Sequence, residues 1–136
     1  WDGEGEPSVE SLVSRFVEAG YVDDEAYARV KSGSLLRKGF GARRIAQALG
    51  EAGIAEDLRE QTRPADAALR QSALRFARKR RLGPFGPPLT DRAAREKQIA
   101  ALIRAGHPLD HARAMVNAPD QDQAELWAGM AEGDES

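Results

Sequence analysis

Residues 49–57, Leu-Gly-Glu-Ala-Gly-Ile-Ala-Glu-Asp, contain a short pattern, Ala-Gly-x-x-x-Asp, that ends one helix and begins the next. The glycine can adopt the left-handed conformation that closes a helix, and the aspartate four residues later can cap the helix that follows. An apolar residue precedes the alanine by three positions at each of its three occurrences, so we predict a repeated helical module. The three occurrences are Ala19-Gly20 with Asp24, Ala52-Gly53 with Asp57, and Ala105-Gly106 with Asp110.

The composition favours helices over strands. The chain has 136 residues, with 24 alanines against ten valines and isoleucines together, and 6% of its residues are aromatic. Alanine is the best helix former, whereas β-branched and aromatic residues prefer strands. We therefore predict an all-α protein with a thin core. No apolar run is long enough to span a membrane, and the sequence shows no secretory signal. The absence of cysteine excludes disulfides and thiol chemistry and is compatible with the cytoplasm, where we expect the protein.

Apolar periodicity and helix breakers predict the elements. We expect helices over residues 9–19 and 24–37, then one that carries Ile45 and Leu49 and stops at Gly53. Further helices are expected over 55–62, 66–82, from Thr90 or Asp91 to Gly106, over 108–117, and a short one over 120–131. Gly39 lies in the break after the second of these helices. The predicted organisation is a disordered start with the last helix of a first repeat (1–22), a second repeat (23–63), a third repeat with a Pro/Gly-rich loop at 83–89 (64–119), and a short C-terminal helix with an acidic tail (120–136).

The net charge of −2 hides a strong segregation. Residues 59–104 carry twelve basic and four acidic groups, whereas the two ends of the chain are acidic. This pattern is typical of a protein with an anionic partner, either nucleic acid or an acidic protein groove, although arginines also simply solvate helix faces. The run Arg78-Lys79-Arg80-Arg81, with Arg75 on the same helix, favours a partner. Four consecutive cations face all round a helix, so amphipathic packing does not explain them.

Two adjacent segments resemble the RecX family, bacterial regulators of recombination. Residues 20–28, Gly-Tyr-Val-Asp-Asp-Glu-Ala-Tyr-Ala, resemble the family segment G-Y-L-D-D-x-x-F/Y-A. Residues 37–45, Arg-Lys-Gly-Phe-Gly-Ala-Arg-Arg-Ile, with Leu49 and Gly53-Ile54, are similar to R-x-K-G-x-G-x-x-R-I-x-x-x-L-x-x-x-G-I. The resemblance is looser from 66 to 117. It implies tandem three-helix repeats in an extended, curved arrangement, of which the first is incomplete here. Trp1 in place of Met suggests that an N-terminal part is missing.

The resemblance also implies a function. RecX proteins are not enzymes; they bind the RecA recombinase, notably its filament on single-stranded DNA, and restrain its ATPase and strand exchange in DNA repair, recombination and the SOS response. We therefore expect a monomer without a cofactor that binds RecA and the RecA–DNA filament, with weak direct DNA binding and no membrane contact. The expected contacts to partner or phosphate are Arg37, Lys38, Arg43, Arg44, Arg75, Arg78, Lys79, Arg80 and Arg81. The expected turn and cap residues are Gly20, Asp24, Gly39, Gly53, Asp57, Gly106 and Asp110.

Other chemistry fits the sequence less well. His107 and His111 have the spacing of a helical metal pair, but Pro108 places His107 at or before the helix start, so we expect a turn residue and a surface residue without metal. The segment at 38–41 lacks the spacing of a phosphate-binding loop, and no catalytic set is visible. Two alternatives remain: a helix-turn-helix DNA-binding protein, read from residues 43–61, and another helical protein-interaction module.

Overall fold

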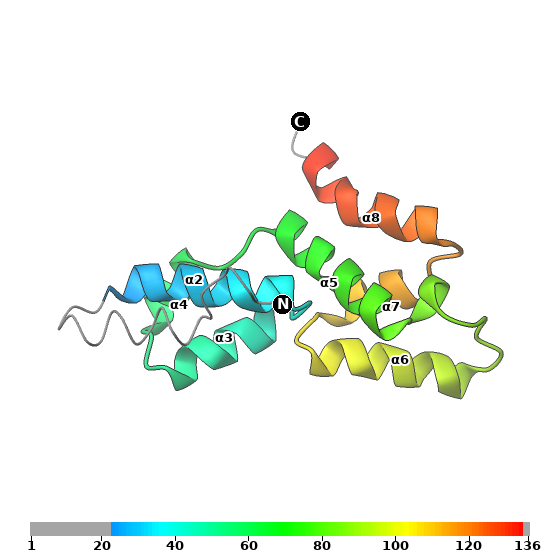
Figure 1. Cartoon of the computed structure of the whole chain (residues 1–136), viewed down its shortest axis with the longest axis horizontal. Coiled ribbons are helices and arrows are strands. Elements are labelled where there is room, and N and C mark those ends of the chain that lie inside the picture. Colours follow the sequence, from blue (N-terminus) through cyan, green and yellow to red (C-terminus); the bar gives the residue numbers. More distant parts are fainter. Residues whose placement is uncertain (1–22, 135–136) are drawn as a thin grey trace, which may run out of the picture.

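The computed structural model describes residues 23–134 and the side chains of residues 23–130, and all of its regular elements are helices. The first three form the α2–α4 unit: α2 (Asp24–Arg37), α3 (Ala42–Glu51) and α4 (Glu56–Gln61). The α5–α7 unit follows, with α5 (Asp66–Arg80), α6 (Arg92–Arg104) and α7 (Leu109–Val116), and with the short 3-10 helix η1 (Gly83–Phe85) between α5 and α6. The last helix, α8 (Gln121–Asp134), packs on α5 (Figure 1).

The two units lie side by side along the longest axis of the molecule, and each has a core of its own (Figure 1). The core of the α2–α4 unit consists of Ala28, Leu35, Ile45, Leu49 and Ile54. The core of the α5–α7 unit is larger, and α8 contributes Ala124 and Ala128 to it. Phe40 packs against both cores, so the turn between α2 and α3 joins them. The predicted helix over 9–19 and Gly20 lie outside the described residues.

Three helices end in the same hydrogen-bonded turn, at Gly39, Gly53 and Gly106. Each glycine has a positive φ, between 87° and 104°, which L side chains rarely adopt. The amide of each glycine and the amide after it bond back to carbonyls in the last turn of the helix, as in Gly53 N to Gly50 O and Ile54 N to Leu49 O, both at 3.0 Å. The structure therefore confirms these three residues as helix-ending glycines.

The aspartates of the pattern do not cap helices, contrary to the sequence prediction. Asp24 is the first residue of α2, and its neighbour Asp23 is the cap, with the Asp23 carboxylate accepting from Ala26 N at 3.1 Å. Asp57 and Asp110 are the second residues of α4 and α7, and each accepts from the next backbone amide. Inside the first turn they still complement the positive end of the helix dipole.

The three pattern matches are also not equivalent in the fold. Gly53 and Gly106 lie at the same place in their units, between the second and the third helix. Asp24 instead begins α2, which is a first helix, like α5. The 53 residues from Gly53 to Gly106 therefore separate equivalent positions in successive three-helix units. The 33 residues from Gly20 to Gly53 do not.

A seam of backbone contacts joins the turn before α3 to the turn after α6. Gly41 N donates to Ala105 O at 2.8 Å, and Arg43 N donates to Gly106 O at 3.1 Å. A Cβ built on Gly41 would lie 2.5 Å from the Gly106 carbonyl, and one built on Gly106 would lie 2.5 Å from Arg44 N. The two backbones can approach this closely only because both residues are glycine. Ser72 of α5 completes the seam by donating to Phe40 O at 2.7 Å.

Helix α8 is longer than predicted. It runs to Asp134, whereas the sequence suggested an end near residue 131 and a frayed acidic tail from 132. Its inner face consists of Ala124 and Ala128, which are 0% exposed. These small residues let α8 lie close to α5, where Gln71 Nε2 donates to Ala128 O at 3.3 Å. No helix in residues 23–134 is long and apolar enough to cross a membrane.

Candidate partner-binding surface

Arg75 of α5 lies beside the end of α2, where Arg37 and Lys38 are exposed. Arg75 Nη1 donates to Leu36 O at 3.0 Å. The next residue, Phe76, has its backbone against Gly39, where an added Cβ would lie 3.1 Å from the Phe76 Cα. The structure thus brings together three of the predicted cations from helices of different units.

The cations at the end of α5 differ in their surroundings. Arg78 forms an ion pair with Glu125 of α8 and lies over the Phe85 ring at 5.6 Å from its centroid. Arg80 lies over the Phe76 ring at 5.0 Å. Arg78 and Arg80 therefore stabilise the fold through ionic and cation–π contacts, which the sequence analysis did not predict.

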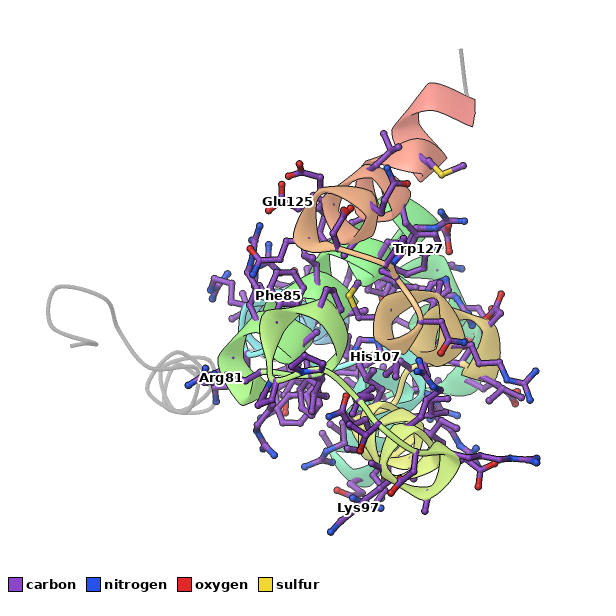
Figure 2. The ribbon with its side chains drawn as sticks, turned by 90° about the vertical axis from the view of Figure 1, so that its right-hand side faces the viewer. Arg81, Phe85, Lys97, His107, Glu125 and Trp127 are labelled. Atoms are coloured by element: carbon purple, nitrogen blue, oxygen red, sulfur yellow. The ribbon has the colours of Figure 1, made fainter. Side chains whose placement is uncertain are left out.

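Lys79 and Arg81 are the two cations of the run that remain available. Both are exposed, and neither side chain makes a hydrogen bond, an ion pair or a ring contact in the described part of the chain. Arg81 has a left-handed backbone, with φ 59°, which ends α5 two residues before the predicted end at Leu82. Figure 2 shows Arg81 on the same side of the molecule as Phe85 and Glu125.

Arg43 and Arg44 form a separate group at the start of α3. Arg43 is exposed, and half-buried Arg44 lies over the Phe40 ring, with its Cζ 5.6 Å from the centroid. Both line a small hollow with Arg104, the last residue of α6. Sequence reasoning missed Arg104, because its neighbours in the hollow come from about sixty residues earlier in the chain. The predicted cations therefore fall into two clusters, and Arg104 joins the second. The α5 cluster consists of Arg37, Lys38, Arg75, Arg78, Lys79, Arg80 and Arg81, and the α3 cluster of Arg43, Arg44 and Arg104.

Both histidines are buried, which corrects the expectation that His111 is a surface residue. His107 is 2% exposed and His111 is 6% exposed. Their rings make separate contacts: His107 Nε2 donates to the Gly39 carbonyl at 2.8 Å, and His111 Nε2 lies 3.2 Å from Asp66 Oδ1. His111 also meets the Trp127 ring edge-on. The described side chains include no group of three or more His, Asp or Glu residues that could hold a metal ion.

Burial lowers the pKa of His107 below its ordinary value of 6.5. The hydrogen bond to Gly39 opposes this shift, and the nearby His111 adds to it. Because a carbonyl oxygen can only accept, Nε2 carries the proton of the neutral ring. Nδ1 is buried without a hydrogen-bond partner among the described residues, so a second proton would find no acceptor there. His107 therefore lies neutral at the centre of the fold (Figure 2) and ties the α6–α7 turn to Gly39.

A family model named RecX, second three-helix domain, matches residues 23–62, which is the α2–α4 unit. The chain is 30% identical to the regulatory protein RecX of Neisseria meningitidis over 107 residues, which cover 79% of this chain and 67% of that protein. The chain belongs to the RecX family. It is also 38% identical to RecX of Myxococcus xanthus over 120 residues, and 30% identical to RecX of Halorhodospira halophila over 114 residues.

These matches cover most of the chain but only part of each RecX protein. They span 85% and 84% of this chain, and 64% and 70% of the Myxococcus and Halorhodospira proteins, respectively. No solved structure matches this chain. The family assignment therefore rests on sequence similarity, and the tandem helical units of the structure are consistent with it.

Proposed function

We propose that this chain regulates the RecA recombinase by binding its filament on single-stranded DNA, where it restrains ATP hydrolysis and strand exchange without catalysing a reaction itself. Membership of the RecX family carries the proposal, and the two cation clusters supply a means of contact. Lys79 and Arg81 in one cluster, and Arg43 and Arg104 in the other, are exposed, and their side chains make no hydrogen bond, ion pair or ring contact in the described part of the chain. In this proposal the α5–α7 unit, residues 64–119, is the third repeat.

The shape of the molecule suggests how binding restrains the filament. The seam at Gly41 and Gly106 fixes the two units relative to each other, so the two cation clusters stand at a fixed spacing. A rigid, elongated body with cations on both units can contact neighbouring protomers of a filament, or the phosphates between them. Bridging of this kind opposes the protomer motions that accompany nucleotide turnover. Binding at a filament end would instead block growth, and the stoichiometry of inhibition distinguishes the two modes.

The test uses the two free cations at the end of α5. Reversing charge at Lys79 and Arg81 (K79E/R81E) leaves the Arg78–Glu125 pair and the Arg80–Phe76 contact in place. The matched control is K97E/R113E, which reverses two exposed cations on α6 and α7; Figure 2 shows Lys97 at a different edge from Arg81. We expect K79E/R81E to bind preassembled RecA filaments about tenfold more weakly, measured by fluorescence anisotropy, and the control to bind like the parent.

Unchanged circular dichroism and an unchanged urea midpoint would show that the K79E/R81E variant is folded. Binding of the folded variant as tight as that of the parent would contradict the assignment of this cluster to the interface. The control separates a local contact from a general effect of net charge, because both variants change the charge by the same amount.

The helix-turn-helix alternative has one observation in its favour, the α3–turn–α4 geometry. However, α4 would be the recognition helix, and its exposed residues include Glu56, Asp57 and Glu60, which repel phosphates. Retained binding to duplex DNA in a gel shift, together with no binding to RecA filaments, would favour this alternative. Binding to neither would favour a different protein partner.

A further inference from the structure

The seam between the two units contains a hollow of about 120 Å³ that neither unit could form alone. It is lined by Arg43, Arg44, Gln47, Ile103, Arg104 and Gly106. The first three come from the first half of α3 and the next residue, and the others from the end of α6 and the turn after it. The start of α3 and the end of α6 lie next to each other in the middle of the molecule (Figure 1). Three of the six lining residues are arginines, and none is acidic.

The charge of this hollow is unbalanced. None of its three guanidinium groups forms an ion pair within the described part of the chain, although three arginines in one small hollow repel one another. Glu51, the carboxylate that contacts the lining residue Gln47 at 3.3 Å, lies a full turn further along α3. The first turn of α3 also has no acidic residue and no side-chain cap. An anion in the hollow would relieve this repulsion.

The hollow is also preorganised in the absence of a ligand. Arg44 lies over the Phe40 ring, which restricts its guanidinium group. The backbone of Arg43 is fixed by its hydrogen bond to Gly106 O, and a side chain on Gly106 would collide with Arg44 N. The Arg43 amide is thus already occupied, and Gly106 packs against the Arg44 amide, so the recognition of an anion falls to the guanidinium groups. Their planar forks of N–H donors match the oxygen atoms of a phosphate.

We propose that the hollow between α3 and α6 is a phosphate-binding site, with Arg43, Arg44 and Arg104 as its ligands. The phosphate can come from two sources, the diester backbone of a nucleic acid strand or a free phosphate-bearing molecule such as a nucleotide. If the phosphate belongs to a nucleic acid strand, the site is one defined contact within the partner-binding surface proposed above, and it rests on that proposal. If the phosphate belongs to a free molecule, the site is independent of the proposed function. The site exists only while the two units are docked.

Inorganic phosphate is the probe for the site, titrated into the purified chain at constant ionic strength with chloride as the balancing anion. We expect saturable shifts of backbone amide signals in the nuclear magnetic resonance spectrum, concentrated at residues 43–47 and 103–106. The variants R104Q and R43Q each lose one charged donor, so each should bind phosphate about tenfold more weakly. The control R113Q removes an exposed arginine of α7 that does not line the hollow, and it should bind like the parent.

Shifts that are linear in phosphate, spread over the whole surface, or unchanged by R104Q and R43Q would overturn the proposal. No RecA is present, so this result and a failure to bind filaments are distinguishable. A single-stranded oligonucleotide then identifies the source. Competition between oligonucleotide and phosphate, together with weaker oligonucleotide binding by R104Q, supports the site as a phosphodiester contact. Phosphate binding that persists at saturating oligonucleotide supports it as a site for a free phosphate.

Discussion

Gly53 and Gly106 have the same left-handed conformation at equivalent turns, but their surroundings differ. A Cβ on Gly53 would meet nothing within 4 Å, whereas one on Gly106 would lie 2.5 Å from the Arg44 amide nitrogen. Gly53 is therefore required only by its own backbone angle. Gly106 is required both by its angle and by the approach of the other unit.

This contrast predicts the stability of two alanine variants. Gly53→Ala should lower the free energy of unfolding by about 1 kcal/mol, the cost of a left-handed L-residue. Gly106→Ala should lower it by roughly 2–4 kcal/mol, since a steric clash adds to the same strain. Urea denaturation of both variants measures the difference. Equal losses of stability in the two variants would mean that the seam accommodates a Cβ at Gly106 without a loss of free energy.

His107 predicts a pH dependence of stability. Its pKa is lowered in the fold, so the unfolded chain takes up a proton at a higher pH than the folded chain does. Stability is therefore fully present above about pH 6.5 and is lost as the pH falls through that value, by at most about 1.4 kcal/mol per pH unit for one proton. The variant His107→Gln should lose less stability than the parent between about pH 7 and pH 5.5.

Thermal unfolding of the parent and of His107→Gln across this pH range measures that difference. Carboxylates that titrate in the same range affect both proteins, so the comparison isolates the histidine. Parallel curves for the two proteins would be inconsistent with a neutral, buried His107.

For single residues, the sequence predicted the roles that depend on neighbours in the chain. The helix-ending roles of Gly39, Gly53 and Gly106 follow from local turn chemistry, and the structure confirms them. The burial of His111 was not predicted, because it depends on Asp66 and Trp127, which lie far away in the sequence. The aspartate caps were predicted wrongly because the sequence does not show the exact residue at which each helix starts. Asp23, not Asp24, caps α2, and Asp57 and Asp110 are already the second residues of α4 and α7.

Among the elements, α8 is held on α5 mainly by its small-residue face. Ala124 and Ala128 are fully buried against the core, whereas the Arg78–Glu125 pair is about half exposed. A pair with that exposure contributes less than about 1 kcal/mol. Arg70 adds a hydrogen bond to the Trp127 carbonyl at 3.0 Å and lies over the Trp127 ring.

Three substitutions in α8 separate these contributions. Ala128→Leu should destabilise the protein by about 1–3 kcal/mol, because the larger side chain has no room against α5. Glu125→Gln should cost less than about 1 kcal/mol. Leu126→Ala, at a side chain that is 59% exposed, should change stability by no more than about 0.5 kcal/mol. Chemical denaturation of the three variants checks the order. A larger loss for Glu125→Gln than for Ala128→Leu would show that the ion pair holds the helix.

The bounds of the elements were predicted where the chain carries a local signal. Residues 24–37 form α2 as expected, between the Asp23 cap and the turn at Gly39. The end of α5 was placed two residues too late, because a left-handed arginine at residue 81 carries no recognisable sequence signal. The end of α8 was placed about three residues too early, because the acidic, glycine-containing residues 132–134 were interpreted as a tail rather than as the last turn of the helix.

At the scale of the whole molecule, the two units form one body through the seam. Long-range contacts decide which cations remain available to a partner. Arg78 is occupied by Glu125, which lies 47 positions further along the chain, and Arg104 joins Arg43 across the seam. The sequence predicted the basic middle of the chain and the family. It did not predict which cations are paired and which are available, because charge counts do not show which side chains meet.

We propose that this RecX-family chain restrains RecA through its exposed, unpaired cations, above all Lys79 and Arg81. The deciding measurement is the single-stranded-DNA-dependent ATPase of RecA from the same organism, titrated at fixed salt with the parent, K79E/R81E and K97E/R113E. We predict that the parent and K97E/R113E inhibit the ATPase, and that K79E/R81E requires about tenfold more protein for the same inhibition. Half-maximal inhibition well below one chain per RecA protomer would indicate end capping rather than binding along the filament. No inhibition by the parent at any ratio would contradict the claim.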